Sequence, residues 1–336
     1  MSNIITQLLN GQYHNHILPF LWIHGEEEAI LRKRMEKICE SGIGAVCVES
    51  RPHEDFLGPI WWRDMDVIMD EARKRDMKVW VLDDKHFPTG SVAGTISKFY
   101  PKYRKWNLKK KHIDAVGPLE GASFLIREHL NGDDRLVAAV ASRRICHESK
   151  RDDSLINLTQ EIKDGILYWN VPKGHWRIFF FIMTRETEKL PDHLNPIVGE
   201  AVRILIDTVY ESHFRHYKDD FGKTFAGFFS DEPQFGNTKD YEAIIGKSNI
   251  LLPWKEDMID KLTDAAGEDF AKYLPCLWHD VGENSTFIRY LYMDTVTKLY
   301  SENFCNQIVN WCSDHGVEYI GHIVEDQNTH ARLGWG

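Results

Sequence analysis

Two apolar runs that end in paired acids constrain this sequence more than any other feature. Residues 225–233 are aromatic and apolar until the last positions, which include Asp231 and Glu232. Residues 317–326 follow the same pattern and also end in two acids. A short apolar run bounded by turn-forming residues is typical of a buried strand. Acids just beyond such strands lie at the carboxyl edge, where open α/β sheets and (β/α) barrels place their chemistry.

Strand-like and helix-like segments alternate in the first part of the chain. The pattern predicts strands at 18–25, 44–50 and 77–84, with helices at 26–41 and 65–74. Continuous apolar strands separated by amphipathic helices indicate a parallel sheet that is buried on both faces. The strand residues that we expect to be buried are Trp22, Val46, Val48, Val79, Val81, Phe228, Ile320 and Ile323.

The pattern changes between about residues 105 and 186, where short strand-like runs are separated by turn signals. We predict a small antiparallel β-domain at 105–190, inserted between two parts of a (β/α) catalytic domain at 1–104 and 191–336. The predicted fold class is α/β, a (β/α) TIM-barrel-type domain. About five strands are recognisable, whereas a closed barrel needs eight. A fragment, a wall from another chain or an open sheet would each explain the difference.

Histidines and acids follow the predicted strands and would converge at one edge of a parallel sheet. These strand-end residues are His24, Glu49, Asp83, Asp84, Asp231, Glu232, His322, Glu325 and Asp326. A single strand-end acid often caps a helix instead, but five strands that end alike favour a shared site. Two glutamates on adjacent strands suit acid/base cleavage of a glycosidic bond. His53, Trp61 and His86 lie in loops and could contact a sugar, although Trp61 could equally begin a helix and pack on the sheet.

Composition argues against several classes of protein. The 336-residue chain has a formal net charge of −10, whereas a nucleic-acid-binding protein usually needs a basic face. We interpret the basic run at 102–111 as a solvated segment that leads into the inserted domain. The six cysteines form no CxxC pair and are expected to be reduced thiols. Neither a secretory signal nor an apolar run of membrane-spanning length is recognised, so a cytoplasmic protein is expected.

Four segments resemble bacterial glycoside hydrolases of the family 2-like and family 106 (α-L-rhamnosidase) type. They are residues 19–26, 42–49, 82–90 and 228–233. The resemblance implies a (β/α)8 catalytic barrel with β-domains and O-glycosyl hydrolase activity. It also implies that Glu232 matches the general acid after the fourth strand and that a later acid, here Glu325, acts as nucleophile or base. A structural Ca²⁺ is the one cofactor that the resemblance suggests.

Two other functions are compatible with the same residues. A metal-dependent hydrolase could use His322, Glu325 and His330, although no HExxH motif occurs. A degenerate barrel could instead bind a glycan without cleaving it. A nucleotide cofactor is disfavoured because the GxGxxG and P-loop motifs are missing. We expect a carbohydrate substrate and no nucleic-acid or membrane partner. The exposed edge strands of an incomplete barrel also predict a homo-oligomer or a partner subunit.

Overall fold

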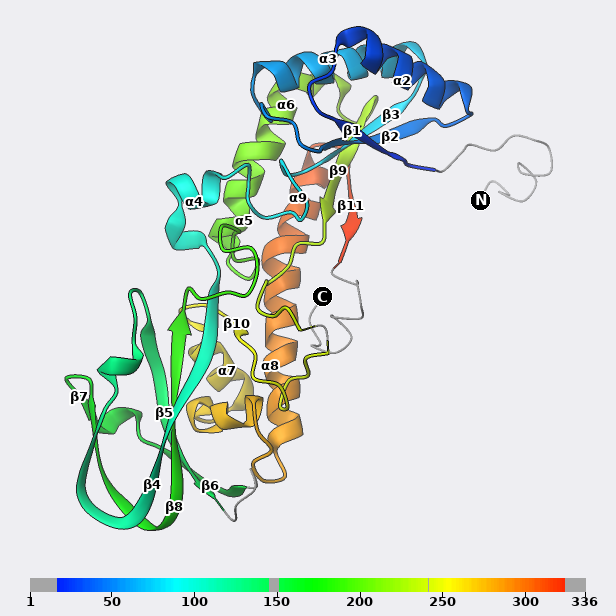
Figure 1. Cartoon of the computed structure of the whole chain (residues 1–336). Coiled ribbons are helices and arrows are strands. Elements are labelled where there is room, and N and C mark those ends of the chain that lie inside the picture. Colours follow the sequence, from blue (N-terminus) through cyan, green and yellow to red (C-terminus); the bar gives the residue numbers. More distant parts are fainter. Residues whose placement is uncertain (1–16, 145–150, 241, 324–336) are drawn as a thin grey trace, which may run out of the picture. The chain divides into compact units, whose positions relative to one another are not determined.

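The computed structural model describes residues 17–144, 151–240 and 242–323, without the side chains of 151–153 (Figure 1). These residues form two compact units. The described part of the first unit comprises residues 17–99, 202–233 and 305–323, and that of the second comprises 100–144, 151–201, 234–240 and 242–304.

The first unit contains a parallel sheet of five strands, which confirms the predicted α/β class. In spatial order the strands are β1 (Phe20–Ile23), β2 (Ala45–Ser50), β3 (Lys78–Leu82), β9 (Phe225–Asp231) and β11 (Glu318–His322). Each strand pairs with the next strand along the chain in this unit, and all four pairings are parallel. All of the strands therefore end at the same edge of the sheet.

Helices connect these strands. They are α2 (Glu28–Glu40), α3 (Pro59–Lys74), α4 (Thr95–Phe99), α5 (Gly199–Leu205), the π-helix η4 (Ile206–Tyr210), α6 (Glu211–Tyr217), the 3₁₀-helix η5 (Lys218–Asp220) and α9 (Asn306–Asp314). In Figure 1, α2 and α3 cover one side of β1, β2 and β3. Helix α3 buries Trp61, Met65, Ile68 and Ala72, whose spacing places them on one stripe of the helix.

The two faces of the parallel sheet differ in burial. Phe228 points to the helical side, where it stacks on Tyr210 with ring centroids 4.0 Å apart. Trp22 is 51% exposed and Ile323 is 44% exposed, while Ile320 is only partly buried. The expected burial of these last three residues is therefore wrong. Successive strand side chains point to opposite faces, and the described residues cover this second face only in part.

Gly227 allows the central strand β9 to pack closely between its neighbours. A Cβ atom at this position would lie 2.1 Å from the main-chain oxygen of Glu318 in β11 and 2.9 Å from Nε1 of Trp80 in β3. Only glycine therefore fits here without displacement of either neighbouring strand.

The second unit contains a sheet in which all pairings between described strands are antiparallel. Its path is β10 (Leu252–Trp254), β4 (Trp106–Leu125), β8 (Ile166–Thr184), β5 (Arg135–Arg144) and β6 (Arg151–Asn157), with β7 (Ile162–Lys163) paired to β8. The other elements are η1 (Pro101–Tyr103), η2 (Arg127–His129), η3 (Thr159–Glu161), α7 (Met258–Ala266), η6 (Phe270–Leu277), α8 (Ser285–Tyr300) and the π-helix η7 (Ser301–Cys305), which precedes α9. Strands β4 to β8 lie within the stretch predicted as an inserted β-domain, and residues 234–304 contribute to the same compact unit.

Strands β4 and β8 pair along nearly their whole lengths and curl around an apolar core that includes Phe180, Ile178 and Trp176. The pairing register shifts on either side of Leu119. Such irregularities increase local twist and bend a sheet. They allow these long strands to curl around one core.

The basic run at 102–111 is partly incorporated into this sheet, so its interpretation as a solvated segment is wrong in part. Lys105 is 4% exposed and Lys109 is 6% exposed. Nζ of Lys109 lies 2.8 Å from a carboxylate oxygen of Asp134 and 2.5 Å from one of Glu186. Residues 105–109 are all buried, and the ion pairs compensate the charge of Lys109.

The described cysteines, which are Cys39, Cys47, Cys276, Cys305 and Cys312, form no disulfide, and Cys146 lies outside the described residues. Across the part of the chain that the structure describes, every helix is too short or too polar to cross a bilayer.

Truncation of Phe228 to alanine should destabilise the first unit, because the ring is fully buried and packs on Tyr210. We expect Phe228→Ala to lower the free energy of unfolding by about 3–5 kcal/mol in urea titrations. Phe99→Ala is the matched control, since Phe99 is 62% exposed and its loss should change stability by less than about 1 kcal/mol. Equal effects of the two substitutions would contradict the assigned packing.

Candidate functional site

The carboxyl edge of the parallel sheet brings together residues from neighbouring strands. The strand register pairs Trp22 with Glu49 across β1 and β2, and Asp231 with His322 across β9 and β11. Strand alternation places Phe229 and Asp231 on the face of β9 opposite to Phe228. On this face Phe229 packs with Cys47 and Leu82, so the face has a small apolar floor with polar residues at its edge.

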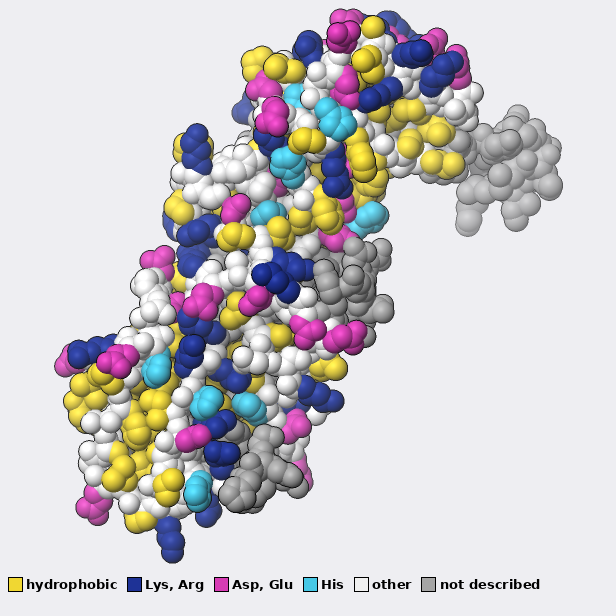
Figure 2. Space-filling view, viewed as in Figure 1, with side chains coloured by type: hydrophobic (Ala, Val, Ile, Leu, Met, Phe, Trp, Pro, Cys, Tyr) yellow, Lys and Arg dark blue, Asp and Glu magenta, His cyan; other side chains and the backbone are white. Residues whose placement is uncertain are grey.

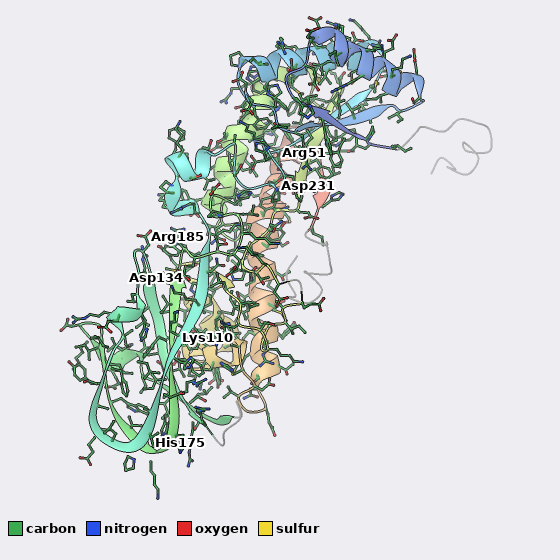
Figure 3. The ribbon with its side chains drawn as sticks, in the orientation of Figure 1. Arg51, Lys110, Asp134, His175, Arg185 and Asp231 are labelled. Atoms are coloured by element: carbon green, nitrogen blue, oxygen red, sulfur yellow. The ribbon has the colours of Figure 1, made fainter. Side chains whose placement is uncertain are left out.

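Glu49 and Arg51 form the first polar pair at this edge. Glu49 is 1% exposed and accepts a hydrogen bond of 2.7 Å from Nε of Arg51. Burial raises the pKa of the Glu49 carboxyl, and the negative charge of Asp231 adds to this rise, while Arg51 and a hydrogen bond from Trp22 oppose it. Glu49 and Asp231 thus lie near enough for their charges to interact, and Figure 3 labels Arg51 and Asp231 close to one another.

The guanidinium of Arg51 lies between two exposed aromatic rings. Its central carbon is 5.1 Å from the ring centroid of Trp22 and 5.3 Å from that of Phe87. Cation–π contacts of this kind fix the position of an arginine. Phe87 is 37% exposed and Trp22 is more so. Figure 2 shows hydrophobic side chains gathered over the strands of this unit. These rings combine an apolar surface with adjacent hydrogen-bonding groups, which is the chemistry that a sugar site requires.

Asp231, Glu232 and His322 form the second group at the edge. A carboxylate oxygen of Asp231 lies at hydrogen-bonding distance, 3.2 Å, from Nδ1 of His322. The His322 ring also contacts the Phe229 ring edge-on. The main-chain N–H of Glu232 donates to the carbonyl oxygen of His322 at 3.2 Å. Glu232 is 8% exposed and has a φ of +42°. A residue other than glycine with a positive φ has a strained backbone, and such strain is concentrated at functional sites.

Asp83 and Asp84 follow β3 but are enclosed. Asp83 is fully buried and accepts hydrogen bonds from the hydroxyls of Thr89 (2.7 Å), Tyr210 (2.7 Å) and Ser230. Burial raises its pKa to about 7. Asp84 accepts hydrogen bonds from the loop that follows it, including the main-chain N–H groups of residues 85, 90, 92 and 93. Both carboxylates therefore fix the backbone around the site, and neither is exposed to a substrate.

The other aromatic residues predicted for the site, which are His24, His53, His86 and Trp61, lie in three kinds of environment. His24 and His86 are exposed, and His24 pairs with Glu26 at 3.1 Å. His53 is 1% exposed and lies 3.2 Å from a carboxylate oxygen of Asp64. Trp61 is fully buried in α3, where its Nε1 donates to His213 at 3.3 Å. Neither His53 nor Trp61 has a free surface on which a sugar could stack.

Glu325, Asp326 and His330 lie outside the described residues, so their positions relative to Glu232 stay predictions. Among the residues that are described, no group of three or more histidine, cysteine or acidic side chains could hold a metal ion.

Arg51 and Trp22 are the site residues that the sequence interpretation missed. Arg51 directly follows the strand at 44–50, and this position is a signal that could have identified it. Trp22 lies within an apolar run of the sequence. Such a run predicts a strand but does not indicate which face of the sheet is left exposed.

The raised pKa of Asp83 predicts a pH dependence of stability. In the folded chain the Asp83 carboxyl keeps its proton up to about pH 7. In the unfolded chain it has the ordinary pKa of 3.8 and loses the proton at a lower pH. Stability contributed by Asp83 should therefore fall as the pH rises from about 4 to 7, by on the order of 1–4 kcal/mol. Asp83→Asn should remove this part of the pH dependence. Urea unfolding at pH 5 and pH 8 tests this, and an unchanged pH difference in the variant would contradict it.

The comparisons with known proteins point to one family. The glycoside hydrolase family 106 model, described as alpha-L-rhamnosidase, matches residues 136–332, which include β9, Glu232 and β11. The structure of the rhamnosidase from Novosphingobium sp. PP1Y is similar to 93% of this chain, with a TM-score of 0.60 and 13% sequence identity. The match covers 46% of that rhamnosidase, so the chain spans about half of its length. At this identity the likeness shows the fold alone. No curated protein matches the chain.

Proposed function

The chain belongs to glycoside hydrolase family 106, and from this premise we propose that it is a glycoside hydrolase that cleaves an α-L-rhamnosidic bond. In this proposal Glu232 is the general acid, and Glu325 is the nucleophile or the base. The observation that carries it is the position of Glu232, an almost fully buried acid with strained backbone at the carboxyl end of the fourth strand of the parallel sheet.

The geometry around Glu232 supports a fixed catalytic position. Its main-chain N–H is bound to His322 of the neighbouring strand β11, and the next residue is Pro233, whose ring restricts φ. A catalytic acid must be held close to the oxygen that it protonates. Hydrogen bonding from β11 and the adjacent proline provide this restraint at the end of β9.

The fold proposed around this site is a (β/α)8 barrel. The five parallel strands follow one another in chain order, and helices cover one of their faces. This is the arrangement found in consecutive strands of such a barrel. The second face, with Trp22 and Phe229, would then face the barrel interior. Strands β1 and β11 each have one neighbour within the described residues, and the barrel would be closed by strands added at these edges, from the rest of the protein or from a partner subunit.

The chemistry assigned to the two acids is protonation and displacement. The Glu232 carboxyl donates its proton to the leaving oxygen, while the Glu325 carboxylate attacks the anomeric carbon or removes a proton from the attacking water. A carboxyl separation of about 5–5.5 Å would give retention of configuration, and one of about 6.5–9.5 Å would give inversion.

Sugar binding is assigned to the polar and aromatic residues of the same edge. Trp22 and Phe87 offer exposed ring surface, and Arg51 lies between them. Asp231 and His322 provide hydrogen-bonding groups close by, while the buried Glu49 carboxyl holds Arg51 in place. His24 and His86 are exposed near the ends of β1 and β3 and remain candidates for outer contacts.

Replacement of Glu232 by glutamine tests the central assignment. The amide cannot donate an acidic proton, so we expect Glu232→Gln to lower turnover of an activated aryl α-L-rhamnoside by about 10²–10⁴-fold. Glu36→Gln is the matched control, because Glu36 is exposed on α2 and should leave turnover unchanged. A screen of aryl glycosides that includes β-galactosides would establish which sugar is cleaved.

Two results would contradict this assignment. Unchanged turnover in Glu232→Gln would remove Glu232 from catalysis. Sugar binding without turnover in the parent chain and in the variant would instead support a carbohydrate-binding barrel that lacks catalysis.

Replacement of Trp22 tests the assigned sugar contact. Loss of the exposed ring should raise KM for the aryl rhamnoside about three- to tenfold, with a smaller change in kcat. Phe99→Ala removes an exposed ring on α4 and should not change KM. A Trp22→Ala variant with the parent KM would show that the substrate does not contact this face of β1.

A further inference from the structure

A cationic cavity in the second unit shares no lining residue with the candidate active site. It has a volume of about 430 Å³ and lies beside η1, the start of β4 and the end of β8. Its lining includes Lys102, Arg104, Trp106, Arg135, Arg185 and Lys255. Figure 3 labels Arg185 just beyond the end of β8, and Lys and Arg side chains are visible in this part of Figure 2.

The positive charge of this cavity is only partly compensated. Arg135 pairs with Glu256 at 2.8 Å, and Lys255 pairs with Asp257 at 2.7 Å. Within the described residues, no carboxylate lies within 4.0 Å of the cationic groups of Lys102, Arg104 or Arg185. Such a cluster is unusual in a chain with a net charge of −10. It therefore calls for an explanation other than general surface charge.

Arg185 is held rigidly within this cluster. Its guanidinium lies 3.5 Å from the ring centroid of Trp106, and it donates to the carbonyl oxygens of Lys102 (2.8 Å), Arg104 and Lys105 (3.3 Å). Its buried Nε has no hydrogen-bond partner among the residues that the structure describes. Burial, together with the positive charges of Arg104 and Arg135, lowers the pKa of Arg185 to about 10. An anion in the cavity would relieve this repulsion.

We propose that this cavity binds the carboxylate of an acidic saccharide, with Lys102 and Arg104 as its main ionic contacts and Arg185 as a fixed background charge. The proposal rests on the proposed function for the saccharide part of the ligand. The volume lies in the range of small-molecule sites and exceeds what an inorganic anion needs. Tyr103 adds an aromatic ring to the lining, and Glu256 and Asp257 add acceptors for sugar hydroxyls. A densely charged polyanion is disfavoured by these acids and by the net charge of the chain.

Calorimetric titration of the full chain at low ionic strength tests the proposal. The ligands are a disaccharide with one hexuronic acid, the same disaccharide with the neutral hexose, acetate and inorganic phosphate. We expect the acidic disaccharide to bind at least about tenfold more tightly than the other three, and added salt to weaken it. Lys102→Gln and Arg104→Gln should each weaken binding about five- to tenfold. Lys298→Gln is the control, since Lys298 is 67% exposed and pairs with Asp294 outside the cavity.

Several results would overturn the proposal. Equal binding of the acidic and neutral disaccharides would exclude recognition of the carboxylate. Equal binding of acetate or phosphate would make the cavity a general anion site. Parent affinity in both Lys102→Gln and Arg104→Gln, or equal weakening in Lys298→Gln, would place the ligand elsewhere. Glu232→Gln should retain the parent affinity, so loss of turnover and loss of this binding are separate outcomes.

Discussion

The pairing of β9 between β3 and β11 is the constraint on which the candidate site depends. The register places Asp231 beside His322, and strand alternation sends Phe228 to the helical side and Phe229 to the other face. A slip of one residue would exchange these faces and move the acid into the apolar core. The close approach at Gly227 and the packing of Phe228 on Tyr210 both fix this register. Stability and site geometry therefore depend on the same strand.

Buried acids at this edge have two different physical roles. Asp83 accepts its hydrogen bonds from hydroxyl groups, and none of the described residues provides a cationic partner for it, so burial strongly raises its pKa. Glu49 is also buried, but Arg51 partly offsets the effect of burial on its pKa. Asp83 thus connects β3, β9 and the helix that carries Tyr210, whereas Glu49 remains next to the exposed rings that we assign to the sugar. The two carboxyl groups therefore differ in role because their hydrogen-bonding and ionic partners differ.

In the second unit, tertiary packing places the basic residues of one sequence run in different environments. Among the lysines and arginines at 102–111, Lys109 lies within β4 and is buried with acidic partners, while Lys102 and Arg104 precede β4 and line the cationic cavity. The cavity and the candidate active site differ in composition, since one is rich in cations and the other in acids and aromatic rings. Within one chain, these sites would recognise different features of a carbohydrate.

The sequence by itself determined the parallel sheet and the residues at the ends of its strands, because apolar periodicity reports local structure and parallel strands share a carboxyl edge. It also indicated the hydrolase family through the segments around 19–26 and 228–233. It could not determine that Trp22 is exposed, that Asp83 is enclosed by Thr89, Tyr210 and Ser230, or that Arg51 lies between two rings. Only the tertiary structure decided these points, because burial and charge compensation depend on residues that are distant in the chain.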